Sequence, residues 1–455
     1  MVLEKLRSEI LEVADLALKY AKDMSIQTAE AYIIKNSLTE VKYSKGKTEC
    51  RDGMLQGIGI RVAEGKKVGF ATCAGFAADS IKSTLVNAHK IAKNRPEDPR
   101  FSGFISESKP GKEGILDTNI TELDSETLVG HLAGLVKETD IDDQRLVGAD
   151  IEVGTQWGGF AVATTEGCLV SSLNTAHYGT VYSVAMGQGE RSTAFDFKVG
   201  RTIQDLSGLG TNAINKSFKH LGSKPLGESL KIPTIWEPLT ASMLLSTTFQ
   251  VGLNGGTVVE KQNPLMHKLN EQIASKDFQL NDDGTIPTKI SSEAIDAEGT
   301  TIGKTEIVKD GVLKSFLFDN FYGPIFGTKS TGNAQRNEPT RYENMPAISP
   351  NKLVLQPGTK NLDEQIAAYD KAIFIEGFPM GMGHSNMITG DFSITATNAY
   401  LVEKGEIVHP LKPVSIAGNF FESLMKIQHI GSDPIDLPFP LESSTLTIDG
   451  HTVSG

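Results

Sequence analysis

Cysteine is scarce in this chain of 455 residues, in which only Cys50, Cys73 and Cys168 occur. They are scattered and odd in number, so they predict neither a disulfide framework nor a zinc knuckle. The N-terminal segment lacks the basic region and the unbroken apolar run of a secretory signal. No apolar run is long enough to cross a bilayer. We therefore expect a cytoplasmic protein with reduced thiols and no membrane partner.

Clusters of basic residues are also missing. The formal net charge is -12, and no run of lysine and arginine interrupts the acidic balance. A nucleic-acid-binding surface usually appears as a basic patch, so we expect no nucleic-acid partner. At 39% hydrophobic and 22% charged residues, the chain has enough apolar side chains for a sizeable core, which excludes general disorder.

Familiar catalytic motifs are incomplete or missing. GTTIGKT, residues 299–305, is one residue shorter than a phosphate-binding loop and leads into a predicted hairpin, which favours an ordinary turn. No G-x-S-x-G occurs, so a serine hydrolase of that kind is not expected. All histidines lie more than five residues apart, whereas paired zinc ligands on one helix face are about four apart. Local spacing therefore predicts no metal site.

The spacing of apolar residues predicts an α+β fold. In GIGIRVAEGKKVGFATC, apolar residues alternate on both sides of a turn at residues 64–66, which is typical of a hairpin. Strand patterns follow one another from residue 145 to residue 201, so we place a domain boundary there. The predicted domains are residues 1–145, with helices and strands, and residues 146–455, with extensive antiparallel sheet. Predicted helices cover residues 3–24, 77–93, 125–138, 209–221, 239–253 and 420–429, and later hairpins turn at residues 310–311 and 404–405.

Two stretches carry the residue types of a functional site, namely GFPMGMGHSNMITGDFS (377–393) and STGNAQR (330–336). The second lies in a long polar segment of a kind that is often functional. An arginine there can clamp a carboxylate, and Asp391 can orient His384. Equally, Thr389 and Asp391 can satisfy backbone N–H groups in a tight turn. The candidate residues are His384, Asn386, Thr389, Asp391, Asn333 and Arg336.

Both stretches resemble the TldD/PmbA family, in particular its PmbA (TldE) branch. AYLVEKGEIVHPLKPVSIAGN, STLTIDGHTVSG and the N-terminal hairpin also match, so the similarity covers nearly the whole chain. The resemblance implies a two-domain TldD/PmbA-like architecture. It also implies two related subunits that together form an intracellular metalloprotease acting on unfolded peptides. The TldD-type subunit holds zinc with H-E-x-x-x-H on a helix and a cysteine near the C-terminus.

The corresponding helix here, within residues 239–253, departs from that motif. The resemblance places Ser246, Thr247 and Val251 where the first histidine, the glutamate and the second histidine would stand. No cysteine follows Cys168. A valine cannot bind zinc, and without a metal there is no activated water. We therefore expect no catalytic residue, no metal and no cofactor in this chain, with zinc held by the TldD-type partner.

The main hypothesis is a PmbA/TldE-like subunit that completes a chamber around the partner's zinc and binds unfolded peptide through the six candidate residues. A homodimer of the isolated chain is compatible with it, because the two subunit types share a fold. Two alternatives stay open. One is a stand-alone peptidase with a non-zinc site at His384 and Asp391, which turnover by the chain alone would favour. The other is a non-enzymatic regulator, to which the family's gyrase-modulator label points and which retention on DNA would favour.

Overall fold

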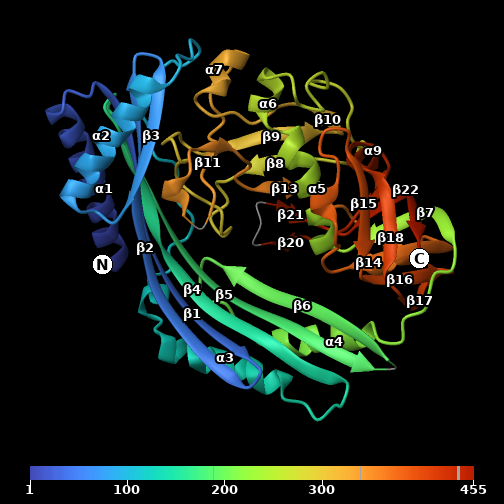
Figure 1. The fold of residues 1–455 in the computed structure, drawn as a ribbon. Helices are drawn as coiled ribbons and strands as arrows, with labels where there is room; N and C mark the ends of the chain where they lie inside the picture. The colour runs from blue at the N-terminus through green and yellow to red at the C-terminus, as the bar shows by residue number, and fades with distance from the viewer. Residues whose placement is uncertain (188, 339, 438–440) are drawn as a thin grey trace.

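The first half of the chain folds into one long antiparallel sheet (Figure 1). The computed structural model describes residues 1–187, 189–338, 340–437 and 441–455. The strand order is β3-β2-β1-β4-β5-β6. The strands are β1 Thr28–Ser44, β2 Lys47–Glu64, β3 Lys67–Ala74, β4 Leu146–Thr164, β5 Leu169–Gly187 and β6 Glu190–Gly200.

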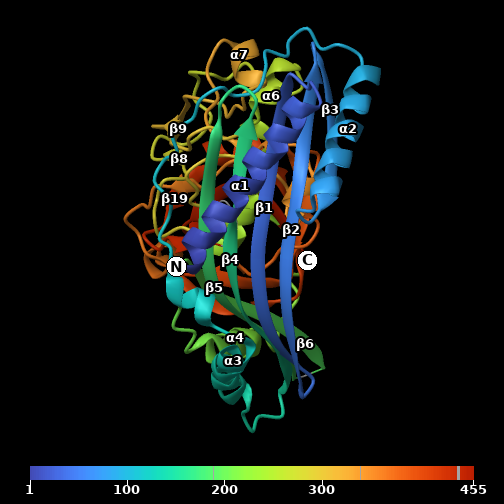
Figure 2. The same ribbon diagram turned by 90° about the vertical axis from the view of Figure 1, so that its left-hand side faces the viewer.

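The two faces of this long sheet have different neighbours, because side chains alternate along each strand. On β1, Ile33 and Val41 belong to clusters made with the helices, whereas Tyr32 and Ile34 pack against the second half of the chain. Figure 2 shows α1 and α2 in front of one end of the sheet and α3 and α4 at the other end. The helices are α1 Val2–Asp23, α2 Ala78–Asn94, α3 Ser125–Thr139 and α4 Leu209–Lys219, with the 3-10 helix η1 Thr118–Glu122.

The apolar spacing of the N-terminal segment explains α1. Buried side chains recur every three or four residues, so one stripe of the helix faces the sheet. The predicted helices at 3–24, 77–93, 125–138, 209–221 and 239–253 are confirmed within a few residues at their ends. The hairpin at residues 64–66 is confirmed as well, since Glu64 pairs with Lys67. The stripe of α1 consists of Leu3, Leu6, Ile10, Ala14, Ala17 and Ala21.

The long sheet continues past residue 145, where the sequence predicts a domain boundary. β4 pairs with β1 from Glu30↔Thr164 to Tyr43↔Ile151. The strands on both sides of residue 145 therefore share one sheet and its two faces. The change to a different sheet lies between β6 and β7, because β7 pairs with β14 and β22.

The second half of the chain contains two further main sheets that are mostly antiparallel. One has the order β10-β9-β8-β13-β21-β20, and the other has β15-β18-β22-β7-β14-β16-β17 with β19 beside β22. A short pair, β11 Ala334–Gln335 and β12 Ala347–Ile348, lies in the polar segment 327–350. The first sheet contains β8 Leu280–Asp283, β9 Lys304–Lys309, β10 Val312–Leu313, β13 Leu353–Leu355, β20 Ile435–Asp436 and β21 Leu441–Ser443. The second contains β7 Ser229–Trp236, β14 Lys371–Glu376, β15 Asp391–Ala396, β16 Asn398–Glu403, β17 Glu406–Leu411, β18 Val414–Asn419, β19 Ile427–Ile430 and β22 Leu446–Ser454.

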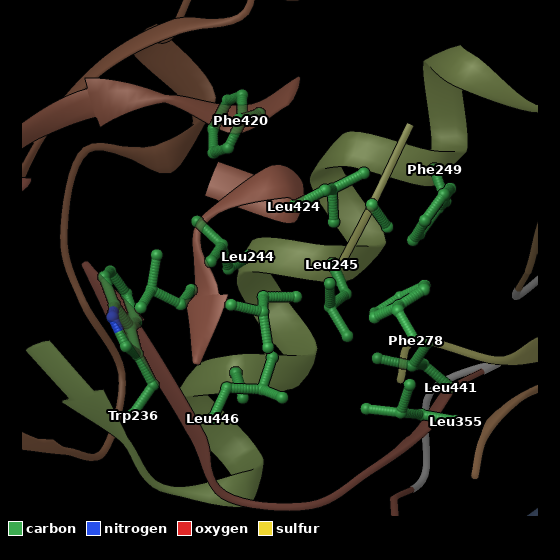
Figure 3. Close-up of a cluster of buried hydrophobic side chains, with 14 of the residues drawn as sticks. Trp236, Leu244, Leu245, Phe249, Phe278, Leu355, Phe420, Leu424, Leu441 and Leu446 are labelled. Atoms are coloured by element: carbon green, nitrogen blue, oxygen red, sulfur yellow. The ribbon is translucent and has the colours of Figure 1, made fainter. Parts of the chain in front are cut away.

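The main core of this half surrounds α5. Figure 3 shows Leu244, Leu245 and Phe249 of this helix among side chains from both sheets. None of the helices in the described ranges is long and apolar enough to cross a membrane. The helices of this half are α5 Pro238–Gly252, α6 Gly255–Val259, α7 Tyr322–Phe326, α8 Leu362–Ala367 and α9 Phe420–Met425, with 3-10 helices η2 Arg341–Glu343 and η3 Met382–His384.

The last predicted helix, over residues 420–429, is too long. The structure ends α9 at Met425 and begins β19 at Ile427. Ile427 pairs with Ile448 of β22, and its side chain joins the main core. Burial of these β-branched residues in the sheet therefore prevails over the helical spacing. The hairpins at residues 310–311 and 404–405 are confirmed. The stretch GQGE (187–190), whose glycines also predict a turn, contains residue 188, which lies outside the described residues.

Candidate functional site

One stripe of α5 is left uncovered by the core. Most of the helix is buried, but Met243, Ser246, Thr247 and Gln250 are at least partly exposed. These positions are three, four and seven residues from Met243, so they lie on one helix face. All four line a cavity of about 340 Å³, which Ser349, Pro350 and Leu353 close from the other side.

The positions that the family motif assigns to zinc ligands are on or next to this stripe. Ser246 and Thr247 line the cavity, and Val251 follows one residue after Gln250. Thr247 Oγ1 donates a hydrogen bond to the carbonyl of Met243 at 2.8 Å. Zinc needs imidazole, thiolate or carboxylate ligands, and two hydroxyl groups and a valine do not fit it. No group of three or more His, Cys, Asp or Glu side chains in the described part of the chain is arranged to hold a metal ion.

A second cavity, also of about 340 Å³, lies at the start of α5. Gly377, Phe378 and Met380 of the glycine-rich stretch line it, together with residues of β5 and β6. The ring of Phe378 meets the edge of Phe195 from β6, with 5.6 Å between centroids. Thr240 Oγ1 donates to the Gly377 carbonyl at 2.9 Å, which joins the stretch to α5. The stretch therefore contributes its first residues to a cavity wall.

Paired carboxylates give this second cavity an acidic lining. Glu237, Glu376 and Asp196 line it, with Lys216 as a basic neighbour. The backbone N–H of Gly377 donates to Glu237 Oε1. Burial raises the pKa of Glu237 to about 7, and the Glu376 carboxylate adds to this rise. Burial lowers the pKa of Lys216, but Asp196, at 3.3 Å, and the two glutamates outweigh it, so this pKa is raised.

A third cavity, of about 510 Å³, lies between the long sheet and the segment 327–350. It shares Pro350 with the cavity beside α5. Arg341 pairs there with Glu293 at 3.1 Å, and the buried Ser291 Oγ has no hydrogen-bond partner in the described ranges. The second and third cavities are lined in part by strands of the long sheet and the first by α5, and we call the three together the α5 cleft.

Asn333 and Arg336, two of the predicted site residues, are buried and connect segments of the fold. Asn333 is fully buried, and its Nδ2 donates to Asp282 Oδ2 at 2.6 Å. The Arg336 guanidinium lies over the Tyr32 ring at 4.4 Å and pairs with Glu30 at 3.3 Å. It thereby fastens the polar segment to the long sheet. Of the two, only Arg336 lines a cavity of the α5 cleft.

The other four predicted residues are exposed, between the end of η3 and the start of β15, and line none of the three cavities. Asn386 Oδ1 accepts from the N–H groups of Ile388 and Thr389, at 3.0 and 3.1 Å. Asp391 accepts from Thr389 Oγ1 at 2.8 Å and from Asn419 Nδ2 at 2.9 Å, and these two hydrogen bonds lower its pKa. No hydrogen bond joins His384 to Asp391 in the described structure.

The sequence allowed Thr389 and Asp391 to bond the backbone N–H groups of a turn, but Asn386 accepts from two of these groups, and Asp391 accepts from side chains. The structure therefore does not bring the six residues into one site, and their role in substrate binding stays a prediction. The residues that sequence reasoning missed are the acidic and aromatic ones of the second cavity. Glu237 and Gly377 are 140 residues apart along the chain, and no local pattern connects them. The one available signal was the start of the glycine-rich stretch, which does line this cavity.

Comparisons with known proteins identify two domains of one metallopeptidase family in this chain. The PmbA/TldA metallopeptidase C-terminal domain matches residues 229–455, and PmbA/TldA metallopeptidase domain 1 matches residues 29–92. An uncharacterized protein of Methanocaldococcus jannaschii is 29% identical over 374 residues, which is 81% of this chain and 83% of that protein. The metalloprotease PmbA of Escherichia coli O157:H7 is 24% identical over 448 residues, or 94% of this chain and 93% of that protein.

Solved structures share the fold over the whole length. TldE from Thermococcus kodakarensis superposes with a TM-score of 0.86 at 22% identity, covering 98% of this chain and 99% of that chain. The two family domains, found in their expected order, lie on the long sheet and on the sheets around α5. The chain is therefore a member of the PmbA/TldD metallopeptidase family.

Proposed function

We propose that this chain is a PmbA/TldE-like subunit of a TldD/TldE-type metalloprotease, in which a TldD-type partner supplies the zinc. The observation that carries the proposal is the uncovered stripe of α5. It borders a cavity where the family motif predicts zinc ligands, but it presents Ser246, Thr247 and Gln250. The family thus supplies the reaction class, and this helix supplies no ligand for it.

The role of this chain is to hold an extended, unfolded peptide beside the partner's zinc. β6 is an edge strand of the long sheet, and its residues 193–197 line the second cavity of the α5 cleft. An edge strand can pair with the backbone of an extended peptide, and the neighbouring cavity can take a side chain. The polar groups of the third cavity offer further hydrogen bonds to the peptide.

The acidic lining of the second cavity favours a peptide with a basic side chain there. Three carboxylates face it against the single ammonium group of Lys216 among its lining residues. A lysine or arginine side chain would bring a second positive charge, and Phe195 and Phe378 would pack on its aliphatic part.

The test is reconstitution with a TldD-type partner and two peptides that differ only in one lysine or glutamate. We expect cleavage by the mixture and not by either chain alone, with a lower KM for the lysine peptide. Glu376→Gln should reduce this preference, whereas Glu403→Gln, exposed at the far end of β16, should not. Equal cleavage by the partner alone would contradict the proposed role of this chain. A homodimer of the isolated chain, checked by sedimentation, is compatible with this proposal, because the two subunit types share a fold.

A further inference from the structure

A larger cavity, of about 570 Å³, lies apart from the α5 cleft and shares no lining residue with it. Its walls come from β1 and β2 of the long sheet, the connection after α2, and residues 298, 319–322 and 345–346. The volume is in the range of small-molecule sites in proteins. We call it the Asp319 cavity, after the side chain that distinguishes it.

Two buried carboxylates and two buried guanidinium groups at this wall balance one another in charge. Arg61 Nε donates to Glu30 at 2.8 Å, and Arg61 Nη2 lies 2.9 Å from Glu298. Glu298 also accepts from the N–H and the side-chain amide of Asn320, both at 3.0 Å. Arg336 approaches Glu30 from behind at 3.3 Å. These groups are held in place and leave no strong charge open to the cavity.

Asp319 is different, because only half of its carboxylate is used. The side chain is 6% exposed and lines the cavity. Its Oδ1 accepts from the N–H groups of Phe321 at 3.1 Å and Tyr322 at 2.7 Å. Its Oδ2 has no hydrogen-bond partner among the described residues, and no cation pairs with it. Because Asp319 lines the cavity, this oxygen is available to accept a hydrogen bond from a group bound there.

Asn320 adds a second open acceptor. Its amide nitrogen is committed, since it donates to Glu298 and, at 2.7 Å, to Thr300 Oγ1. Its Oδ1 accepts no hydrogen bond from the described part of the chain. Asn320 also lines the cavity. Two neighbouring side chains therefore present acceptors only, and a group that carries several N–H donors on a positive charge satisfies both.

The other lining residues include four aromatic side chains, besides the charged Lys66, Arg95 and Asp98. Phe101 and Phe104 meet edge to face with 5.3 Å between centroids, and Phe321 and Tyr322 do so at 4.8 Å. Met345 borders the same cavity and is 41% exposed, so it lies near the solvent side. Aromatic walls beside a few fixed polar groups are typical of sites for organic molecules rather than bare ions.

We propose that the Asp319 cavity binds an organic ammonium ion with an apolar or aromatic body. The ammonium group donates to Asp319 Oδ2 and Asn320 Oδ1, and the body packs against Phe101, Phe104 and Tyr322. The exposed Lys66 and Arg95 also line the cavity. A free amine, an amino acid and a peptide N-terminus share this ammonium chemistry. The Asp319 cavity shares no lining residue with the α5 cleft.

The test is calorimetric titration of the full chain with three probes of similar size: 2-phenylethylamine, 3-phenylpropionate and L-phenylalanine. We expect saturable binding of 2-phenylethylamine, at least about tenfold tighter than that of 3-phenylpropionate, because a charge-assisted hydrogen bond to a buried carboxylate is lost in the latter. Tighter binding of L-phenylalanine than of the amine identifies an amino acid or peptide source, and weaker binding identifies a simple amine. Equal binding of amine and acid, or no saturable amine binding at millimolar concentration, would overturn the proposal.

Two variants probe the geometry. Asp319→Asn keeps an oxygen for the N–H groups of Phe321 and Tyr322 but removes the charge, and should weaken the amine about tenfold or more. Met345→Trp narrows the cavity from an exposed position and should also weaken the binding of the amine. This second variant keeps the test decisive if Asp319→Asn folds poorly. Asp277→Asn, an exposed carboxylate outside the cavity, serves as the matched control and should bind as the natural chain does. Unchanged affinity in a folded Asp319→Asn or in Met345→Trp would refute this placement of the ligand.

Discussion

Replacing Arg336 by alanine separates the two roles that this side chain can have. The sequence predicts a substrate-binding arginine, whereas the structure shows a buried joint between the polar segment and the long sheet. Its guanidinium group is fully buried, pairs with Glu30 at 3.3 Å and donates to the carbonyl of Asn344. It also lies over the rings of Tyr32, at 4.4 Å, and Phe70, at 5.7 Å.

The expected cost follows from these contacts. Removing one partner of a buried ion pair destabilises a protein by about 3–5 kcal/mol. Glu30 keeps its bond to Arg61, so its charge is not left alone. We therefore expect Arg336→Ala to lower the free energy of unfolding by about 3 kcal/mol, at the low end of that range. The stability of Arg336→Lys should lie between those of the natural chain and Arg336→Ala, because lysine keeps the charge but not the forked geometry.

The assay is urea denaturation followed by tryptophan fluorescence, with peptide affinity measured on the same samples. Arg51→Ala is the control, because Arg51 is exposed on β2, and its effect should stay within about 0.5 kcal/mol. A folded Arg336→Ala protein of unchanged stability that binds peptide much more weakly would refute the structural role. It would instead support the sequence-based prediction of a substrate contact.

Three further predictions concern the core and the α5 cleft. Leu245 of α5 is fully buried in the main core, so Leu245→Ala should lower the free energy of unfolding by about 2–5 kcal/mol, measured by the same urea denaturation. Phe378→Ala should raise the KM of the reconstituted protease, since Phe378 lines the second cavity, with little loss of stability, since this residue is 40% exposed. The control is Phe326→Ala on α7, which is also 40% exposed and should leave the KM unchanged. The pKa of Glu237 is raised to about 7, so the folded chain binds this proton more tightly than the unfolded chain does. The stability that the proton contributes is fully present below about pH 4.5 and is lost as the pH rises through about 7. The urea midpoint should therefore fall more between pH 5 and pH 8 in the natural chain than in Glu237→Gln, and an equal fall in both would contradict the assigned pKa.

Local pattern was sufficient to predict much of the fold. The apolar stripe of α1 and the alternation around residues 64–66 are properties of short segments, and both appear where expected. The pairing of β4 with β1 is different. It joins residues more than a hundred positions apart, and neither segment contains a local pattern that predicts which strand it pairs with. The boundary at residue 145 was inferred from a change of pattern, and such a change does not end a sheet.

The candidate site was harder to predict, because residue type does not reveal burial. Asn333 and Arg336 have the chemistry of ligand-binding residues, but the fold uses their hydrogen bonds to join its own segments. Asp391 likewise accepts from Asn419, its partner across β15 and β18. The carboxylates of Glu237 and Glu376 meet only after β7 and β14 pair side by side. Their cavity therefore depends on the tertiary fold, which local spacing cannot supply.

The most direct test of the proposed function is the zinc content of the isolated chain, measured together with its peptidase activity on an unstructured peptide. The TldD-type partner and the mixture are measured in parallel, after all samples are equilibrated with zinc and freed of excess metal. We predict that this chain carries no stoichiometric zinc and cleaves nothing alone, while the mixture cleaves with zinc held by the partner. One zinc ion per isolated chain, or turnover by this chain without a partner, would contradict the account.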